Sequence, residues 1–377
     1  MEKILLEDCC EILDSMRVPI TSSDRVEGPY PYYGANGIQD HVAEYIFDDE
    51  LVLLAEDGGN FGSKERSIAY RVSGKCWVNN HAHVLKPKDG LDVDYLCYSL
   101  MFYDVGGMVN GATRQKLTQA AMRQMLIPKR SITEQQYIVK LLGKVVSIKE
   151  ERKHQLEELD NLIKARFVEL FGDLEKNDKG WDERPLLDVC NQLKRYPTFC
   201  NMDYLEQGTR VIRIGNILLD GHMDADDNNY VFVYDTVNED FPDTVISIND
   251  IVMAVRGDGS AAKRIGIIQE EKLVGANISP NLIRIQANSG VVAPLFLFHY
   301  LISEVGQKRL DSYVNKTAKK NIAAKDIAKV KTPVPEMRLQ NEYVEFVKQV
   351  DKSKVVVQKS LDETQKLFDS LMQEYFG

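Results

Sequence analysis

The stretch "ARFVELFG", residues 165–172, closes a long charged and leucine-rich run, and "SLMQEYFG", residues 370–377, closes a second one 205 residues later. Laying residues 128–172 over residues 333–377 requires no gap and gives eleven identities in forty-five pairs. Two unrelated amphipathic helices would share leucines, but they would not also share a proline at the entry and Phe-Gly at the exit. We therefore interpret the two segments as copies of one element. The identical pairs are Pro128/Pro333, Gln135/Gln340, Val139/Val344, Val145/Val350, Lys149/Lys354, Leu156/Leu361, Glu158/Glu363, Leu162/Leu367, Glu169/Glu374, Phe171/Phe376 and Gly172/Gly377.

The repeat continues upstream of these segments with short gaps, and its pieces occur in the same order in both halves. A repeated order of this kind predicts a tandem duplication with a period near 200 residues. The corresponding pieces are "LLEDCC" (5–10) and "LLDVCN" (186–191), "DELVLLAEDGG" (49–59) and "DIVMAVRGDGS" (250–260), "VNNHAHVLKP" (78–87) and "NISPNLIRIQ" (277–286), and "GATRQKL" (111–117) and "NKTAKKNI" (315–322). By contrast, "GPYPYYGANGIQDHVAEYIF" (28–47) has no readable counterpart in the second half.

Each half is predicted to be a mixed domain followed by one long helix. Short β-branched and aromatic runs with Gly, Asn and Asp turns fill residues 1–128 and 182–333, which indicates an α+β domain with a mainly β core. Residues 129–172 and 334–377 are the predicted helical segments, with helices from about 133 to 170 and from about 339 to 375. The polar stretch 173–181 is the expected linker between the halves.

The two predicted helices carry apolar side chains in steps of three and four, which is typical of a coiled coil. Neither helix can bury such a stripe alone in water, so each is the expected partner of the other. An antiparallel pair would relate the two mixed domains by pseudo-twofold symmetry and hold them apart. The expected seam is Ile138, Leu141, Val145, Ile148, Leu159 and Leu162 in the first helix, and Tyr343, Phe346, Val350, Leu361, Leu367 and Leu371 in the second.

Charge and composition narrow the function classes. The net charge of −10 opposes DNA binding at first sight, but eight Lys and Arg residues lie between Lys308 and Lys331 against only Asp311 and Asp326. The six cysteines show no CxxC spacing, and His81 and His83 have no third ligand near them in the sequence, so we expect reduced thiols and no metal site. The first residues show no secretion signal, and no apolar run is long enough to span a bilayer, so we expect a cytoplasmic protein.

Several of these pieces together resemble the specificity subunit of a type I restriction–modification system. They are "IPKRSITEQQ" (127–136), "TRQKL" (113–117), "TAKKNI" (317–322) and "YPYYGANGI" (30–38). The resemblance covers essentially the full chain and implies the order target-recognition domain, long helix, target-recognition domain, long helix. It further implies a bacterial or archaeal protein that reads a two-part site in double-stranded DNA, binds two methyltransferase subunits and joins restriction/translocase subunits.

No catalytic motif accompanies this pattern. The chain has no [ND]PP[YF] motif of an amino-methyltransferase and no GxxxxGK[ST] phosphate loop. We therefore expect a non-catalytic subunit without a cofactor of its own, and the resemblance assigns S-adenosylmethionine, ATP and Mg²⁺ to the partner subunits. The recognition part of a single-chain restriction enzyme would need catalytic motifs, whereas a coiled-coil adaptor without a DNA role would be indifferent to DNA and to salt.

Two kinds of residue are predicted to contact DNA. Phosphate contacts need Lys or Arg at matched places before each long helix, and base contacts need polar, charged or aromatic side chains on glycine-rich loops. The alternatives are solvated lysines in the first case and core or turn packing of the tyrosines in the second. The predicted phosphate contacts are Arg114, Lys116, Lys316, Lys319 and Lys320, and the predicted base readers are Tyr32, Asn36, Asn60, Lys64, Arg66, Arg256, Lys263 and Arg264.

Overall fold

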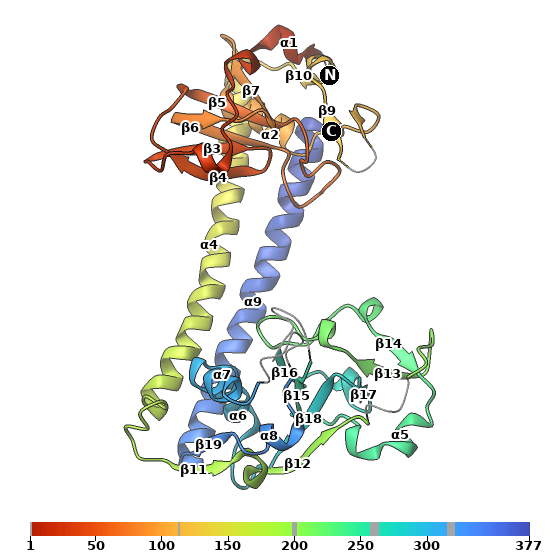
Figure 1. Ribbon diagram of the computed structural model, residues 1–377. Helices are drawn as coiled ribbons and strands as arrows, with labels where there is room; N and C mark the ends of the chain where they lie inside the picture. Colours follow the sequence, from red (N-terminus) through yellow and green to blue (C-terminus); the bar gives the residue numbers. More distant parts are fainter. Residues whose placement is uncertain (1, 112–113, 198–201, 257–263, 315–320) are drawn as a thin grey trace. The chain divides into compact units, whose positions relative to one another are not determined.

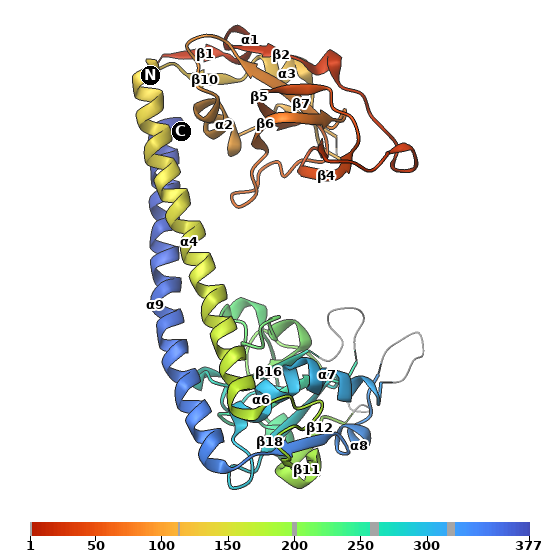
Figure 2. The same cartoon turned by 90° about the vertical axis from the view of Figure 1, so that its left-hand side faces the viewer.

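The computed structural model describes residues 2–111, 114–197, 202–256, 264–314 and 321–377. The chain divides into two compact units, unit 1 with Met1–Gln155 and Val357–Gly377, and unit 2 with Leu156–Val356. Each unit contains one mixed domain and parts of two long helices, α4 (Ile132–Phe171) and α9 (Met337–Phe376) (Figures 1 and 2). The helices thus extend slightly beyond the predicted ranges at both ends.

Unit 1 is built on a six-stranded sheet in the order β2-β7-β5-β6-β3-β4, with helix α2 packed against β5, β6 and β7 (Figure 2). The central strand β5 is apolar and fully buried from Leu51 to Ala55, as expected of a strand covered on both faces. A short pair, β1 with β10, leads into α4. The elements are β1 (Lys3–Leu5), α1 (Leu6–Cys9), β2 (Cys10–Ile12), β3 (Tyr30–Gly34), β4 (Gly37–Val42), β5 (Phe47–Ala55), β6 (Ala69–Val78), β7 (Ala82–Pro87), α2 (Val93–Met101), β8 (Val109–Asn110), β9 (Lys116–Leu117), α3 (Gln119–Arg123) and β10 (Leu126–Pro128).

Unit 2 repeats four strands of this sheet in the same order, as β12-β18-β15-β16, and adds a three-stranded sheet, β14-β13-β17. The pair β11 with β19 leads into α9 as β1 with β10 leads into α4. The prediction of a duplicated α+β fold is confirmed. The elements are β11 (Asp182–Pro185), β12 (Cys190–Arg195), β13 (Thr209–Ile212), β14 (Val231–Val233), α5 (Val237–Asp240), β15 (Ile251–Ala254), β16 (Ile265–Ile267), β17 (Asn277–Ile278), β18 (Leu282–Ala287), α6 (Pro294–Ile302), α7 (Glu304–Asp311), α8 (Ala324–Ile327) and β19 (Lys331–Val334).

Strand β3 of unit 1 has a structural counterpart, contrary to the expectation from the sequence. It runs parallel to β6, and the Tyr33 carbonyl accepts a hydrogen bond from the Asn79 amide at 3.0 Å. In unit 2, β13 runs parallel to β17, and the Ile212 carbonyl accepts one from the Ser279 amide at 2.9 Å. The two strands therefore occupy the same place although their side chains share no pattern, because parallel pairing uses only backbone groups.

Two identical glutamines of the repeat attach the start of each long helix to its unit. In unit 1, Gln135 accepts a hydrogen bond from the Asp92 amide at 2.8 Å and donates to the carbonyls of Gly90 at 3.0 Å and Arg130 at 2.9 Å. In unit 2, Gln340 accepts one from the Ala293 amide at 2.7 Å and donates to two carbonyls, those of Val291 at 3.3 Å and Pro335 at 2.7 Å. Both side chains are buried. Asp92 and Ala293 are the N-caps of α2 and α6, so each glutamine joins the starts of two helices.

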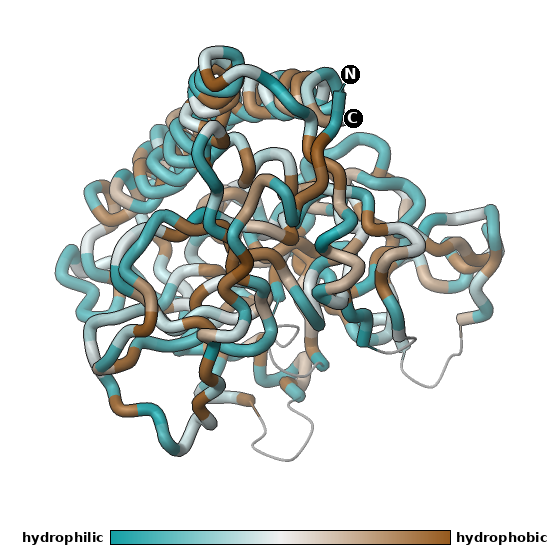
Figure 3. Tube along the Cα trace, turned by 90° about the horizontal axis from the view of Figure 1, so that it is seen from above, coloured by the Kyte–Doolittle hydropathy of each residue, from teal (hydrophilic) through white to brown (hydrophobic). Residues whose placement is uncertain are grey.

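The long helices pack antiparallel within each unit. In unit 1, Ile138 and Val145 from the first part of α4 share a core with Phe368 from the last part of α9. In unit 2, Phe167 from the last part of α4 stacks against Phe296 and makes an edge contact with Tyr343 from the first part of α9. The coiled stretch of tube near the chain ends in Figure 3 carries both brown and teal residues, as expected of a helix that buries one face.

The predicted seam is wrong at several positions. Ile148, Leu162 and Leu367 are 42%, 47% and 50% exposed, whereas Leu142 and Ile163 are buried instead. Steps of three and four can alternate in either order along a helix. The spacing alone therefore does not show which of two neighbouring apolar residues belongs to the buried stripe. These three predicted seam residues therefore lie on the outside of the helices.

Candidate nucleic-acid interface

Five of the seven predicted contact residues of unit 1 lie at or beside one end of its sheet, where β5 ends and β6 and β7 begin. The Glu56 amide donates to the His81 carbonyl at 2.9 Å, and the Leu117 amide donates to the Glu56 carbonyl at 2.7 Å. The Ala55 amide donates to the Ile68 carbonyl at 2.8 Å. These bonds bring four segments together that lie far apart in the sequence. We call this region the sheet end of unit 1.

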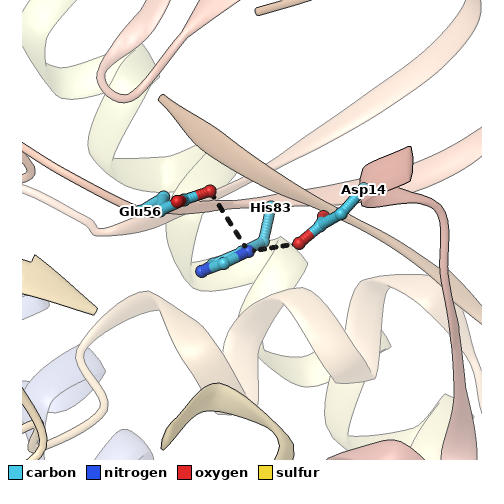
Figure 4. Close-up of side chains that lie close together, drawn as sticks. All are labelled: Asp14, Glu56 and His83. Carbon is cyan, nitrogen blue, oxygen red and sulfur yellow. Dashed lines mark hydrogen bonds and ion pairs between the residues drawn. The ribbon is translucent and has the colours of Figure 1, made fainter. Parts of the chain in front are cut away.

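A buried ionic network lies inside this sheet end (Figure 4). His83 Nδ1 lies 2.6 Å from Asp14 Oδ2, and His83 Nε2 lies 2.9 Å from the carbonyl oxygen of Leu117. Asp14 is ionised: burial raises its pKa, but the hydrogen bonds from His83, the Val84 amide and Gln119 outweigh this and hold the pKa below the usual value. Both ring nitrogens of His83 therefore face oxygen atoms that can accept a hydrogen bond. His83 thereby ties the segment around Leu117 to the strand β7.

Asp14, Glu56 and His83 also have ligand atoms within 4.8 Å of one another, the spacing of a metal site. These atoms already have partners. Arg17 donates to Glu56 at 2.6 Å, and Lys116 pairs with the other oxygen of Glu56 at 2.9 Å. Arg17 and Lys116 thus balance the two carboxylates, and His83 Nε2 faces a carbonyl rather than an open position. The arrangement fits an ion-pair network better than a metal site.

The two predicted phosphate contacts of unit 1 lie on the outer side of this network. Arg114 pairs with Asp57 at 2.8 Å, and its side chain is 61% exposed. Lys116 is half exposed and pairs with Glu56, whose pKa is raised by burial but lowered overall by the bonds from Lys116 and Arg17. Both cations are held in place, and both are paired with a carboxylate.

Three predicted base readers line one hollow of about 570 Å³ beside the sheet end, together with Tyr33 and Tyr70. Asn60 donates to the amide oxygen of Asn36 at 3.2 Å, and Asn36 donates to the Gly58 carbonyl at 3.0 Å. Arg66 lies on the rim and is exposed. Asn and Arg are the side chains that pair with the major-groove edges of adenine and guanine. The structure brings these three together although the sequence separates them.

Two other predicted readers of unit 1 lie elsewhere. Tyr32 is 1% exposed, and its hydroxyl bonds the backbone of Ile20, so it belongs to the core and is not accessible to a ligand. This prediction is corrected, because alternation along β3 turns Tyr32 inward and Tyr33 toward the hollow. Lys64 is exposed but lines a different hollow of about 760 Å³, together with residues of α9 such as Met372.

In unit 2, the corresponding sheet end carries arginines. Arg256 follows β15 and is exposed, and its backbone forms an isolated antiparallel β-bridge with Asn321. Arg264 precedes β16, and its guanidinium donates to the Ile217 carbonyl at 3.1 Å. Arg195 ends β12 and was missed by the sequence analysis, because nothing in its local pattern separates it from any strand-end cation. The predicted residues Lys263, Lys316, Lys319 and Lys320 lie outside the described residues.

Backbone hydrogen bonds fix which positions of the two sheet ends correspond. The Ala55 amide bonds the Ile68 carbonyl, as the Ala254 amide bonds that of Arg264 at 2.8 Å. The next residues along the chain, Glu56 and Val255, also match: the Glu56 carbonyl accepts a hydrogen bond from the Leu117 amide, and the Val255 carbonyl accepts one from the Ile322 amide. Asp57 therefore corresponds to Arg256. The sequence alignment, which matched the two Asp-Gly pairs, is two positions out of register here.

Comparison with known proteins decides the family. The family model described as type I restriction modification DNA specificity domain matches residues 1–158 and again residues 178–364. The chain belongs to this family. The match to each half confirms the internal repeat, and the chain is a type I restriction–modification specificity subunit, a non-catalytic component.

Relatives of this specificity subunit carry the same description. It is 39% identical over 146 residues to a Haemophilus influenzae protein named as a type I restriction enzyme specificity subunit, covering 39% of this chain and 37% of that protein. It is 24% identical over 272 residues to the EcoBI specificity subunit of Escherichia coli, covering 65% of this chain and 56% of that one. The matched stretches thus span between about a third and about half of the relatives' lengths.

Solved structures show the same fold for the specificity subunit over its whole length. The S subunit of a type I restriction–modification system from M. genitalium aligns with a TM-score of 0.57 at 15% identity, covering all of this chain and 96% of that one. A chain from a study of complex assembly in the type I system aligns with a TM-score of 0.54 at 14% identity, covering 100% and 97%. No described helix is both long and apolar enough to cross a membrane.

Proposed function

We propose that each mixed domain of this specificity subunit reads one half of a two-part DNA site, and that the helices set the distance between the halves. One observation carries this proposal: the two units share the same backbone arrangement, but their side chains differ at corresponding positions of the sheet ends. Asp57 of unit 1 corresponds to Arg256 of unit 2, and Glu56 corresponds to Val255. Two readers that share a backbone but differ in contact chemistry suit an asymmetric target.

Within unit 1 the proposed contacts divide by chemistry. Arg114 and Lys116, held by carboxylates at the sheet end, contact backbone phosphates. Asn36, Asn60 and Arg66, which line the same hollow, contact base edges. Lys64 and the four lysines outside the described residues remain candidate contacts on sequence grounds alone.

The helices are proposed to bind two methyltransferase subunits, one on each copy of the same face. Three identical pairs of the repeat are exposed in both helices: Glu158/Glu363, Leu162/Leu367 and Glu169/Glu374. They are spaced by four and seven residues, so they share one helix face. The core does not require an identical exposed face, whereas two copies of one partner would. Restriction/translocase subunits would join this assembly, and S-adenosylmethionine, ATP and Mg²⁺ would act in the partners.

Mapping methylated adenines across the genome of a host, with and without this reading frame, tests the DNA function. The expected result is one two-part motif whose methylation disappears when the reading frame is deleted. Replacing Asn60 and Arg66 by Ala should then change or abolish only one half of the motif. Methylation that is unchanged on deletion would leave the adaptor interpretation as the better one, and loss of both halves in the double variant would contradict separate readers.

A further inference from the structure

The two sheet ends have opposite charge at two equivalent positions. Asp57 of unit 1 corresponds to Arg256, as the backbone bonds above establish. The β-ladders give the second pair: Ile12 pairs with Leu85 in unit 1, and Leu193 pairs with Ile285 in unit 2. Two residues further along each chain, Asp14 corresponds to Arg195. At both positions an aspartate in unit 1 thus corresponds to an arginine in unit 2.

At the sheet end of unit 1, Arg17, Arg114 and Lys116 each have a carboxylate partner. Arg114 and His81 both contact Asp57, at 2.8 and 2.6 Å. Arg17 and Lys116 both contact Glu56. A phosphate that approaches Arg114 or Lys116 therefore meets a cation whose charge is already balanced by a carboxylate. Such a cation neutralises the phosphate only weakly, so few counterions are released from the DNA and the contact adds little salt dependence.

Among the residues that the structure describes, no such compensation is found at the sheet end of unit 2. Within the described ranges, Arg195, Arg256 and Arg264 form no ion pair with a carboxylate. Arg195 donates Nε and one terminal nitrogen to the Pro280 carbonyl at 3.0 and 2.9 Å, which fixes its guanidinium at the end of β12. Arg195 pairs with Ile283 across β12 and β18, and Ile283 pairs with Met253 on β15, three residues before Arg256, so the ladders place both arginines at one end of the sheet. Burial lowers the pKa of Arg195, and the charge of Arg256 lowers it further. The Arg264 Nε is buried and has no hydrogen-bond partner among the described residues.

Like charges held together without a counterion are unfavourable, and an anionic ligand removes the penalty. We infer that Arg195, Arg256 and Arg264, the last two of which were predicted from the sequence as base readers, instead form an anion site that binds backbone phosphates of DNA, so that the second domain supplies most of the salt-dependent affinity. The first domain then contributes base contacts and little net charge. This inference rests on the proposed DNA-binding function and adds a division of labour between the domains. Guanidinium groups suit this role because they bind phosphate oxygens in pairs.

The test compares the salt dependence of DNA binding between variants of the full chain. Arg256→Gln removes one charge at an exposed side chain, and Arg195→Gln removes the second. Arg114→Gln is the equivalent change in unit 1, and Arg184→Gln is the matched control, because Arg184 is an exposed arginine of unit 2 on β11 that pairs with Asp182. Affinity for one duplex is measured by fluorescence anisotropy across salt concentrations.

Each lost phosphate contact should lower the slope of log K against log salt by about 0.9, so the affinity lost between about 50 and 200 mM salt should shrink by about 3.5-fold. We expect this change for Arg256→Gln and again for Arg195→Gln, less than half of it for Arg114→Gln and none for Arg184→Gln. An unchanged slope in Arg256→Gln together with a full reduction in Arg114→Gln would overturn the inference while leaving DNA binding intact. No salt-dependent affinity in the unaltered chain would overturn both.

Discussion

The buried glutamine at the start of each long helix provides a sharp test of how the repeat is built. Gln340→Met keeps the length of the side chain and removes its amide. Three partners then lose a hydrogen bond: the Ala293 amide and the carbonyls of Val291 and Pro335. At about 1 kcal/mol for each bond lost, the free energy of unfolding should fall by about 3 kcal/mol. Gln135→Met should lower the free energy of unfolding by the same amount, because Gln135 also makes three hydrogen bonds.

Urea unfolding followed by circular dichroism measures this loss, and hydrogen exchange locates it. The Ala293 amide donates to Gln340 at the N-cap of α6, so exchange in the peptide that contains Ala293 should accelerate in Gln340→Met. Gln349→Met is the matched control, because Gln349 is an exposed residue of α9. A loss below about 1 kcal/mol in both variants would refute the role of the two glutamines, because leaving three buried groups without hydrogen bonds costs more than that. A large loss in only one variant would refute the structural equivalence of the two halves.

Three further predictions follow from the same structure. Tyr32→Phe should cost about 1 kcal/mol of stability, measured in urea, through its lost backbone hydrogen bond, and should leave the methylated motif unchanged. The hydrogen bond that His222 donates to the Asp220 carboxylate raises the pKa of His222 and lowers the pKa of Asp220 to about 2, so their joint stabilisation should be greatest between pH of about 4 and 6.5. It should fall as pH rises through the raised pKa of His222 and as pH drops toward 2, and urea midpoints of His222→Gln should lack the alkaline decline. Leu162→Asp and Leu367→Asp should change stability by less than about 0.5 kcal/mol, because both are half exposed, while each removes one methyltransferase copy by mass photometry.

The fold could be predicted because its signals are local and occur twice. Helix periodicity, strand composition and turn residues each act over a few residues, and the internal repeat supplied a second reading of each. The seam was less certain, since Leu141 and Leu142 are both apolar and only packing against the partner helix separates them. Tyr32 shows the same limit in a strand: three tyrosines in one run do not reveal which one faces inward.

The site could be predicted only in part, because it is assembled from segments far apart in the sequence. Asn36, Asn60 and Arg66 were named for their chemistry, and the hollow that they share depends on how β3, β4 and the loop after β5 meet. Asp14 and His83 lie 69 positions apart, so no spacing rule could pair them. The register of Arg256 against Asp57 was also hidden, because the shared Asp-Gly pairs drew the alignment two positions away.

The positions of the identical residues in the repeat indicate that the residues that hold the fold differ from those that contact the DNA target. Pro128 and Pro333 hold matching places in the strand pairs that lead into the helices, and Gln135 and Gln340 make matching bonds. Both domains must satisfy the same backbone groups, so these residues cannot vary independently of the fold. The sheet ends face no such demand, and there the two units differ even in the sign of charge. Divergence between the copies, more than identity, therefore points to the residues that distinguish one half of a target from the other.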